Sequence, residues 1–215
     1  GWTRCGWVRS PSGQALRPSF VPPPAIRRLR DVARYRADLV GVRTAEKQRV
    51  EKLLEDAHIK LSVVASDIFG VSGRAMLAAL IAGERDPKVL AELARGRMRT
   101  KRSVLEEAFT GHFTDHHGFL LARMLGRVDG LDADIAELDH KLEELIIPFT
   151  AAADRLDEIT GVGRTAACAI IAEVGVDMGR FPTPGHLASW ARFAPGVKQS
   201  AGKTKGKSST GHGNP

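Results

Sequence analysis

Apolar residues between Leu121 and Leu145 follow one another at alternating steps of three and four residues. This spacing lines one face of a helix with apolar side chains, and most positions between them are charged. The pattern predicts a coiled-coil helix over residues 116–148, ended by Pro148. Two arrangements fit it: a dimer of two chains, or a long antiparallel helical hairpin within one chain. The expected oligomerisation residues are Val128, Leu131, Ile135, Leu138 and Leu142.

Upstream of this segment, the chain alternates helical patterns with turn signals. From Pro24, apolar residues at helical spacing stand among Arg, Lys and Glu, which predicts a helical region over 25–115. Residues 1–24 show no periodicity and are expected to form an irregular leader. Within the helical region the sequence predicts a helix stop and turn at 67–73, a short buried helix at 74–82, a helix at 88–94 and a helix at 103–113.

Downstream, residues 149–197 predict a domain similar to a helix-hairpin-helix, followed by a basic flexible tail at 198–215. Its second helix is expected at 164–174, and Ile159 and Val162 are expected to pack inward. A short helix within 181–196 is expected to place Leu187, Trp190 and Phe193 in the core. The predicted fold class is therefore mainly α, with long helices, a coiled-coil segment and a C-terminal helix-hairpin-helix-like domain.

The composition of the chain indicates which kind of partner it binds. The chain has 215 residues, 43% of them apolar, with a net charge of +7 and a pI of about 9.8, so an anionic polymer is a favoured partner. Cys5 and Cys168 are too few for a disulfide framework or a zinc cluster. No long apolar run or signal peptide occurs. We expect a soluble, cytoplasmic, DNA-associated protein without membrane contact.

The segment Gly161-Val162-Gly163 is the first candidate binding site. Two glycines between helices allow a tight turn with exposed amides, and the N-terminus of the next helix attracts a phosphate. An ordinary glycine cap between two helices is the alternative. Basic residues around the turn favour DNA, and the predicted DNA-binding residues are Gly161, Gly163, Arg164, Lys198, Lys203, Lys205 and Lys207.

Two further clusters leave alternatives open. Arg95, Arg97, Arg99, Lys101 and Arg102 form either a phosphate-contacting face or, by preference, a solvated helix face. The histidines at 112, 116 and 117 stand near a metal-binding spacing, but a surface cluster is the favoured interpretation, and no metal site is predicted.

The tail also carries hydroxyl groups among its lysines. A serine that attacks a phosphodiester needs activation and cations near the phosphate. A flexible Gly, Ser and Lys terminus without chemistry is the favoured alternative from the residues alone.

Over residues 20–215 the chain resembles insertion-sequence transposases that pair an N-terminal four-carboxylate (DEDD, RuvC-like) domain with a C-terminal serine transposase domain. Piv-type DNA invertases are relatives. The resemblance is carried by residues 19–77, by the heptad helix, and by residues 159–215. It implies DNA recombination, in which the element is cut out and rejoined. In this family a serine and acidic residues that hold a divalent metal, Mg, cleave the strands.

The resemblance also implies individual roles and partners. Ser200, in Gln199-Ser200-Ala201-Gly202-Lys203, lies where the nucleophile is expected, with Ser208 and Ser209 as alternatives. Ala201 stands where the family more often has Gly. Implied partners are DNA (element ends and target), a guide RNA in some members, and a second copy of the chain.

The chain departs from the family at its front, where Asp31 and Asp38 do not match the four-carboxylate motif. We therefore expect a truncated member that holds no metal cofactor of its own and cannot cleave DNA alone. The alternative function is a non-enzymatic helical protein that binds DNA or acts as a scaffold.

Overall fold

The computed structural model describes residues 8–9, 15–16, 21–191, 193, 199–200 and 203–204, and its fold is mainly α, as predicted. The chain divides into two compact units, residues 27–148 and the remainder, residues 1–26 with 149–215. Among the described residues, no helix combines the length and the apolar character that a membrane span requires.

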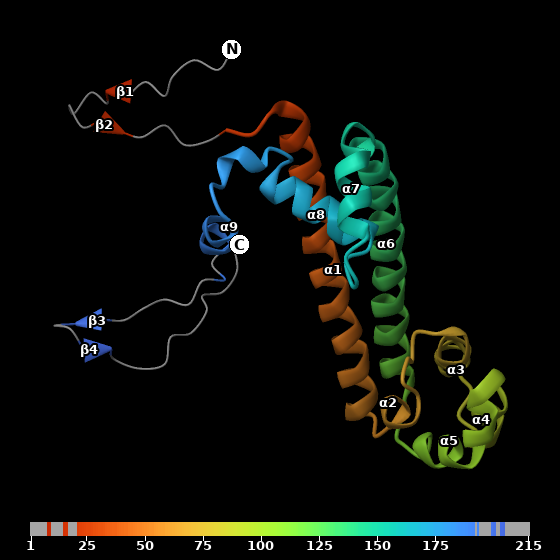
Figure 1. The fold of residues 1–215 in the computed structure, drawn as a ribbon. Coiled ribbons are helices and arrows are strands. Elements are labelled where there is room, and N and C mark those ends of the chain that lie inside the picture. The colour runs from red at the N-terminus through yellow and green to blue at the C-terminus, as the bar shows by residue number, and fades with distance from the viewer. Residues whose placement is uncertain are drawn as a thin grey trace. The chain divides into compact units, whose positions relative to one another are not determined.

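Two long helices dominate the unit of residues 27–148. They are α1 (Pro24–Asp56) and α6 (Asp115–Ile146), which lie side by side (Figure 1). Shorter helices connect them: α2 (Leu61–Val64), α3 (Val71–Ile81), α4 (Pro87–Glu92), a 3₁₀ helix (Gly96–Lys101) and α5 (Arg102–Ala108).

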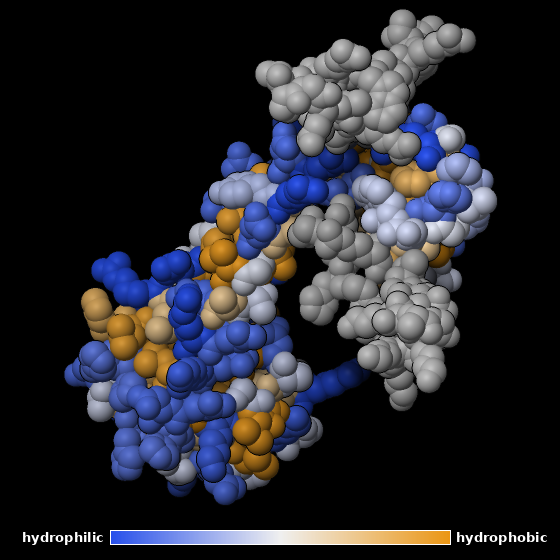
Figure 2. Space-filling view, turned by 90° about the vertical axis from the view of Figure 1, so that its left-hand side faces the viewer, coloured by the Kyte–Doolittle hydropathy of each residue, from blue (hydrophilic) through white to orange (hydrophobic). Residues whose placement is uncertain are grey.

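The short helices form a small cluster around one apolar core. Leu54 at the end of α1, Leu77 in α3, Leu105 in α5 and Leu121 in α6 are all fully buried in it. Burial of such a side chain contributes about 1.5–3 kcal/mol. On the face that Figure 2 shows, the surface at this end of the unit is largely hydrophilic, with apolar patches. The cluster therefore fixes the positions of the segments that connect its helices.

The predicted turn at 67–73 is shorter than expected, because α3 already begins at Val71. Gly73 lies in the first turn of α3, against the backbone of Ile68. A Cβ atom at Gly73 would lie 2.1 Å from the carbonyl oxygen of Ile68. The glycine that suggested a turn therefore serves close packing inside a helix.

The predicted helix at 103–113 is also shorter, since α5 ends at Ala108. The carbonyl of Ala108 accepts a hydrogen bond from the amide of Lys60 at 3.0 Å. The amide of His112 donates to the carbonyl of Ala57 at 2.8 Å. These contacts with the segment that follows α1 take the place of the last helical turn.

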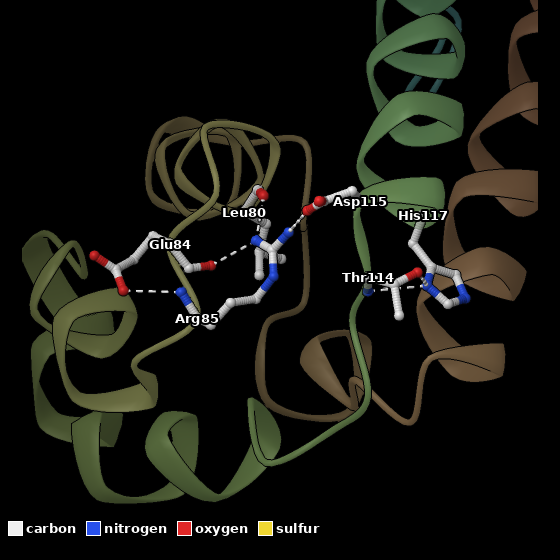
Figure 3. A network of polar contacts seen from close by, with 6 residues as sticks. All are labelled: Leu80, Glu84, Arg85, Thr114, Asp115 and His117. Atoms are coloured by element: carbon white, nitrogen blue, oxygen red, sulfur yellow. Dashed lines mark hydrogen bonds and ion pairs between the residues drawn. The ribbon is translucent and has the colours of Figure 1, made fainter.

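Arg85, in the turn between α3 and α4, ties the helical cluster to the start of α6. Its guanidinium donates to the carbonyls of Leu80, at 2.6 Å, and Glu84, at 2.8 Å (Figure 3). It also pairs with Asp115 at 3.1 Å. Thr114 caps α6, with its amide donating to Nδ1 of His117 at 3.1 Å. The N-terminus of α6 is thus held by its own cap and by a neighbouring turn.

The heptad residues of α6 are covered within a single chain. Leu121, Val128, Ile135 and Leu142, at every seventh position, are buried. The intervening seam residues are half-buried: Met124, Leu131, Leu138 and Leu145.

Ion pairs show that α1 and α6 run antiparallel. Arg36 of α1 pairs with Asp139 of α6, and Arg43 pairs with Asp132 at 2.6 Å. As the residue number rises in α1 it falls in α6, and each step is seven residues. The antiparallel hairpin within one chain, one of the two arrangements that the heptad pattern allowed, is therefore the one present in this chain.

The other unit is built on a pair of contacting helices, α7 (Thr150–Asp157) and α8 (Arg164–Val174). Their buried residues are small or aliphatic: Ala153, Ala167, Cys168, Ile171 and Ala172. The remaining elements are 3₁₀ helices Ile147–Phe149 and Met178–Arg180, α9 (Pro184–Trp190), and two antiparallel strand pairs, β1 (Val8–Arg9) with β2 (Ala15–Leu16) and β3 (Gln199–Ser200) with β4 (Lys203–Thr204).

The aromatic core expected around α9 is wrong in part. Leu187 is half-buried, whereas Trp190 is exposed and Phe193 is 66% exposed. Trp190 instead meets Phe181 edge to face, with ring centroids 5.8 Å apart. A helix of this length offers few positions to bury, and the two aromatic residues stand at its end and beyond it.

Candidate nucleic-acid interface

The turn between α7 and α8, which we call the hairpin (residues 159–164), is tight. The amide of Val162 donates to the carbonyl of Ile159 at 2.9 Å. Gly161 has a φ of +90°, a backbone conformation that residues with a Cβ atom rarely adopt. Gly163 is extended and forms the N-cap of α8. The two glycines therefore have different roles, one as a conformational requirement and one at the helix start.

The hairpin faces open space. Gly161, Gly163 and Arg164 are exposed, and a Cβ atom at either glycine would have nothing within 4 Å. Ile159 is 53% exposed, so the expectation that it packs inward is wrong. Val162 is half-buried and is the apolar residue that anchors the turn. A large ligand can therefore reach the backbone here without displacing a side chain.

The N-terminus of α8 has unsatisfied donors. Gly163 provides no side-chain cap, and the first hydrogen bond of the helix runs from the amide of Ala167 to the carbonyl of Gly163 at 3.0 Å. The amides of residues 164–166 precede that bond, so they have no acceptor within the helix. These three residues are exposed. Together with the positive end of the helix dipole, they make a site for an anion.

Arg164 is already engaged on the protein surface. Its Nη1 atom pairs with a carboxylate oxygen of Asp154 in α7 at 2.7 Å, and the two side chains are 42% and 61% exposed. A pair this exposed contributes little to stability, at most about 1 kcal/mol. The guanidinium can therefore leave Asp154 for a more highly charged partner. Asp154 was not predicted as a site residue, although its place one turn before the end of α7, ten residues before Arg164, is a local signal for this pair.

The expected tail residues are described only in part. Ser200 in β3 lies opposite Lys203 in β4 in an antiparallel pair. This pairing brings the backbones of the predicted nucleophile and a predicted phosphate-binding residue together. The other tail candidates lie outside the described residues: Lys198, Lys205, Lys207, Ser208 and Ser209.

The histidines do not meet at one point. His117 is used in the cap of α6 through Nδ1, while His112 and His116 are exposed. In the part of the chain that the structure describes, no group of three or more His, Cys, Asp or Glu side chains is placed to hold a metal ion.

The five candidate oligomerisation residues lie in one helix but differ in access. Val128, Ile135 and Leu142 are buried, and Leu131 and Leu138 are half-buried. A second chain would therefore contact Leu131 and Leu138 before the other three residues. Self-association through this face stays a prediction.

The C-terminal part of the chain matches a family of known proteins. Residues 153–215 match the family described as "Transposase IS116/IS110/IS902 family". No curated protein and no solved structure matches the chain. The matched segment contains the hairpin, α8, α9 and the tail, and it leaves residues 27–148 unmatched. The C-terminal part of this chain, which presents the exposed hairpin, is thus similar to insertion-sequence transposases of that family.

Proposed function

We propose that this chain is a DNA-binding insertion-sequence transposase component that holds the phosphate backbone at the hairpin. One observation carries the proposal: the N-terminus of α8 is exposed and uncapped, and it lies in the segment that matches a transposase family. A phosphate oxygen would accept hydrogen bonds from the free amides, and the absence of side chains at Gly161 and Gly163 lets the backbone approach it.

Basic side chains would strengthen this contact. Arg164 stands directly behind the hairpin, and Lys198, Lys203, Lys205 and Lys207 follow in the tail. Arginine can bind a phosphate through two parallel hydrogen bonds, whereas lysine acts as a point charge. Each contact releases counterions from DNA, so the binding free energy depends on salt.

Ser200 is the proposed nucleophile, with Ser208 and Ser209 as alternatives. In such a step the serine hydroxyl would give up its proton and its oxygen would form a bond to phosphorus, while the bond from phosphorus to the leaving sugar oxygen breaks and that oxygen takes up a proton. Lys203 is the backbone partner of Ser200 in the strand pair, and we propose that its charge stabilises the negative charge that develops on the phosphate.

We further propose that this polypeptide binds DNA without cleaving it. The family resemblance assigns metal ligands to a four-carboxylate domain, and this sequence offers no match to that motif. Asp31 and Asp38 are exposed on α1, where neither has an acidic partner that would complete a metal site in the part of the chain the structure describes. Partners proposed by the same resemblance are the element ends, the target DNA and a guide RNA.

The binding proposal predicts opposite effects at Arg164 and Asp154. Arg164→Ala removes a phosphate-binding charge and should weaken binding of a short DNA duplex, lowering the slope of log K against log salt by about 1. Asp154→Asn removes a repulsive charge and frees Arg164, so it should tighten binding. Fluorescence anisotropy of labelled DNA over a salt series measures both. Equal affinities for the wild type and both variants would remove the hairpin from the interface.

Strand cleavage is tested separately. Supercoiled plasmid carrying candidate element ends is incubated with the purified chain and Mg²⁺, and we expect no nicked product above that of the Ser200→Ala variant. Mg-dependent nicking that Ser200→Ala abolishes would show that the chain is an active nuclease and would overturn this part of the proposal.

A further inference from the structure

An arginine-rich segment lies outside the part of the chain that matches the transposase family. We call residues 95–101, between α4 and α5, the arginine segment. Arg95, Arg97 and Arg99 are exposed in it, and the structure gives their side chains no hydrogen bond or ion pair among the described residues.

Most other arginines of the same unit are neutralised. Carboxylate partners lie within ion-pair distance of Arg36, Arg43, Arg49, Arg74, Arg85, Arg102 and Arg127. Three unpaired guanidinium groups within five residues therefore form a local excess of positive charge.

The backbone that carries these three arginines is firmly held. The amide of Arg95 donates to the hydroxyl of buried Ser72 at 2.9 Å, and Met98 packs against the apolar core. At the other end, Nζ of Lys101 donates to the carbonyl of Val64 at 2.8 Å. Gly96 has a φ of +56°, which lets the chain turn into the 3₁₀ helix. Binding through this segment would therefore order side chains, not backbone.

The spacing of two of these arginines is close to that of a phosphate backbone. Arg97 and Arg99 lie in the 3₁₀ helix, which rises about 2 Å per residue, so they are about 4 Å apart along its axis, and Arg95 precedes the helix as its N-cap. Phosphates on one strand of duplex DNA recur every 3.4 Å of rise, roughly, which is about the same step. Guanidinium groups bind phosphate oxygens through paired hydrogen bonds.

We propose that the arginine segment is a second nucleic-acid contact, at which Arg95, Arg97 and Arg99 bind phosphodiester groups independently of the hairpin. The ligand chemistry is the phosphodiester backbone, which duplex DNA and structured RNA share. The site lies in the unit of residues 27–148, so it does not depend on the transposase match.

The test compares full-length chains that differ in charge at defined positions. The variant is Arg95→Ala with Arg97→Ala and Arg99→Ala. A matched control removes three exposed positive charges elsewhere, by Arg27→Ala, Arg28→Ala and Lys52→Ala. A third variant replaces the same three arginines by lysine and keeps the charge. Circular dichroism and the unfolding midpoint verify that each variant folds.

Binding is measured over a salt series with two probes, a short DNA duplex and an RNA hairpin. For at least one probe the alanine variant should lower the slope of log K against log salt by about 2–3, with at least about a tenfold loss of affinity at low salt. The matched control should lose much less, and the lysine variant should keep most of the slope. The probe that responds identifies the source of the phosphodiester. A loss no greater than that of the control, with both probes, overturns the proposal.

A second measurement uses the unaltered chain. Phenylglyoxal modifies accessible arginines, and mass spectrometry follows each site with and without the nucleic acid. Protection of residues 95–99, with no protection of Arg28, supports the proposal, and unchanged modification contradicts it. The binding of Arg164→Ala is measured in parallel with that of the alanine variant. If only the alanine variant loses affinity, the arginine segment is retained as a contact and the hairpin is rejected. If only Arg164→Ala loses affinity, the hairpin is retained and the arginine segment is rejected.

Discussion

At the scale of single residues, the two hairpin glycines have different roles, so substitutions at them should affect the stability of the protein and its binding of DNA differently. Gly161 requires its positive φ, whereas Gly163 has an extended backbone that any residue can adopt. Neither position is sterically crowded, because a Cβ atom at either would meet nothing within 4 Å. The same substitution should therefore have different consequences at two sites two residues apart.

We predict that Gly161→Ala destabilises the hairpin by about 1–2 kcal/mol, the cost of a left-handed backbone for a residue with a Cβ atom. Gly163→Ala should leave the unfolding free energy within about 1 kcal/mol of the wild type, or raise it slightly, because alanine restricts the unfolded chain. Its DNA affinity should nevertheless fall, since a methyl group would stand between the amides and a phosphate. Chemical denaturation and anisotropy on the same samples check this, and wild-type affinity in Gly163→Ala would argue against a backbone cradle.

Single residues also show which features of the fold a sequence pattern can predict and which it cannot. The glycine spacing correctly predicted a turn at 161–163, because backbone freedom is a property of the residue itself. The exposure of Ile159, Trp190 and Phe193 could not be predicted the same way. An apolar side chain shows that burial is favourable, but whether another element covers it depends on contacts between distant parts of the chain.

At the scale of elements, the long helices were the most predictable part. The heptad pattern of α6 and the short helix expected at 88–94 are local signals, and both appear in the structure, the second as α4. The pattern could not choose between two partners for the seam, because another copy of α6 and the helix α1 offer similar apolar faces. The ion pairs from Arg36 and Arg43 to α6 decide the partner within the chain, and they depend on two segments far apart in sequence.

Self-association through α6 remains open to test at this scale. We predict that Leu131→Asp with Leu138→Asp abolishes oligomers, because these half-buried positions are the part of the seam that a second chain reaches first. The matched control places two aspartates on the exposed face of the same helix, by Ala133→Asp and Ala136→Asp. Sedimentation velocity measures the assembly. Identical sedimentation of the wild type and both variants would show that the seam residues of α6 pack only against α1 of the same chain.

At the scale of the whole molecule, the chain combines a matched C-terminal segment with a larger unmatched unit. Its net charge of +7 was consistent with nucleic-acid binding, but net charge could not locate a site. The structure shows where unpaired positive charge gathers, because several arginines of the residue 27–148 unit have carboxylate partners, whereas the side chains of Arg95, Arg97 and Arg99 have none among the described residues. Pairing depends on which acidic residues lie nearby in space, so composition alone cannot reveal it.

Removal of residues 198–215 tests the contribution of the tail to the whole molecule. This deletion eliminates four lysines, so the salt slope for duplex DNA should fall by up to about 3–4. The unfolding transition of the residue 27–148 unit should not change, because the described residues of its apolar core lie between Val50 and Leu125. Binding over a salt series and thermal denaturation measure the two effects. An unchanged slope would exclude the tail lysines from the interface.

The seven-residue spacing of the ion pairs between α1 and α6 also determines the register in which the two helices pack. A heptad seam can slide by one repeat and still match apolar residues with apolar residues. Such a slip would bring Arg36 opposite Ile146, or Arg43 opposite Leu125, and either would leave a guanidinium against an apolar side chain. The paired charges therefore penalise misalignment, and chains in which both arginines are replaced by leucine should gain a mixture of shifted helical pairings at little cost in overall stability.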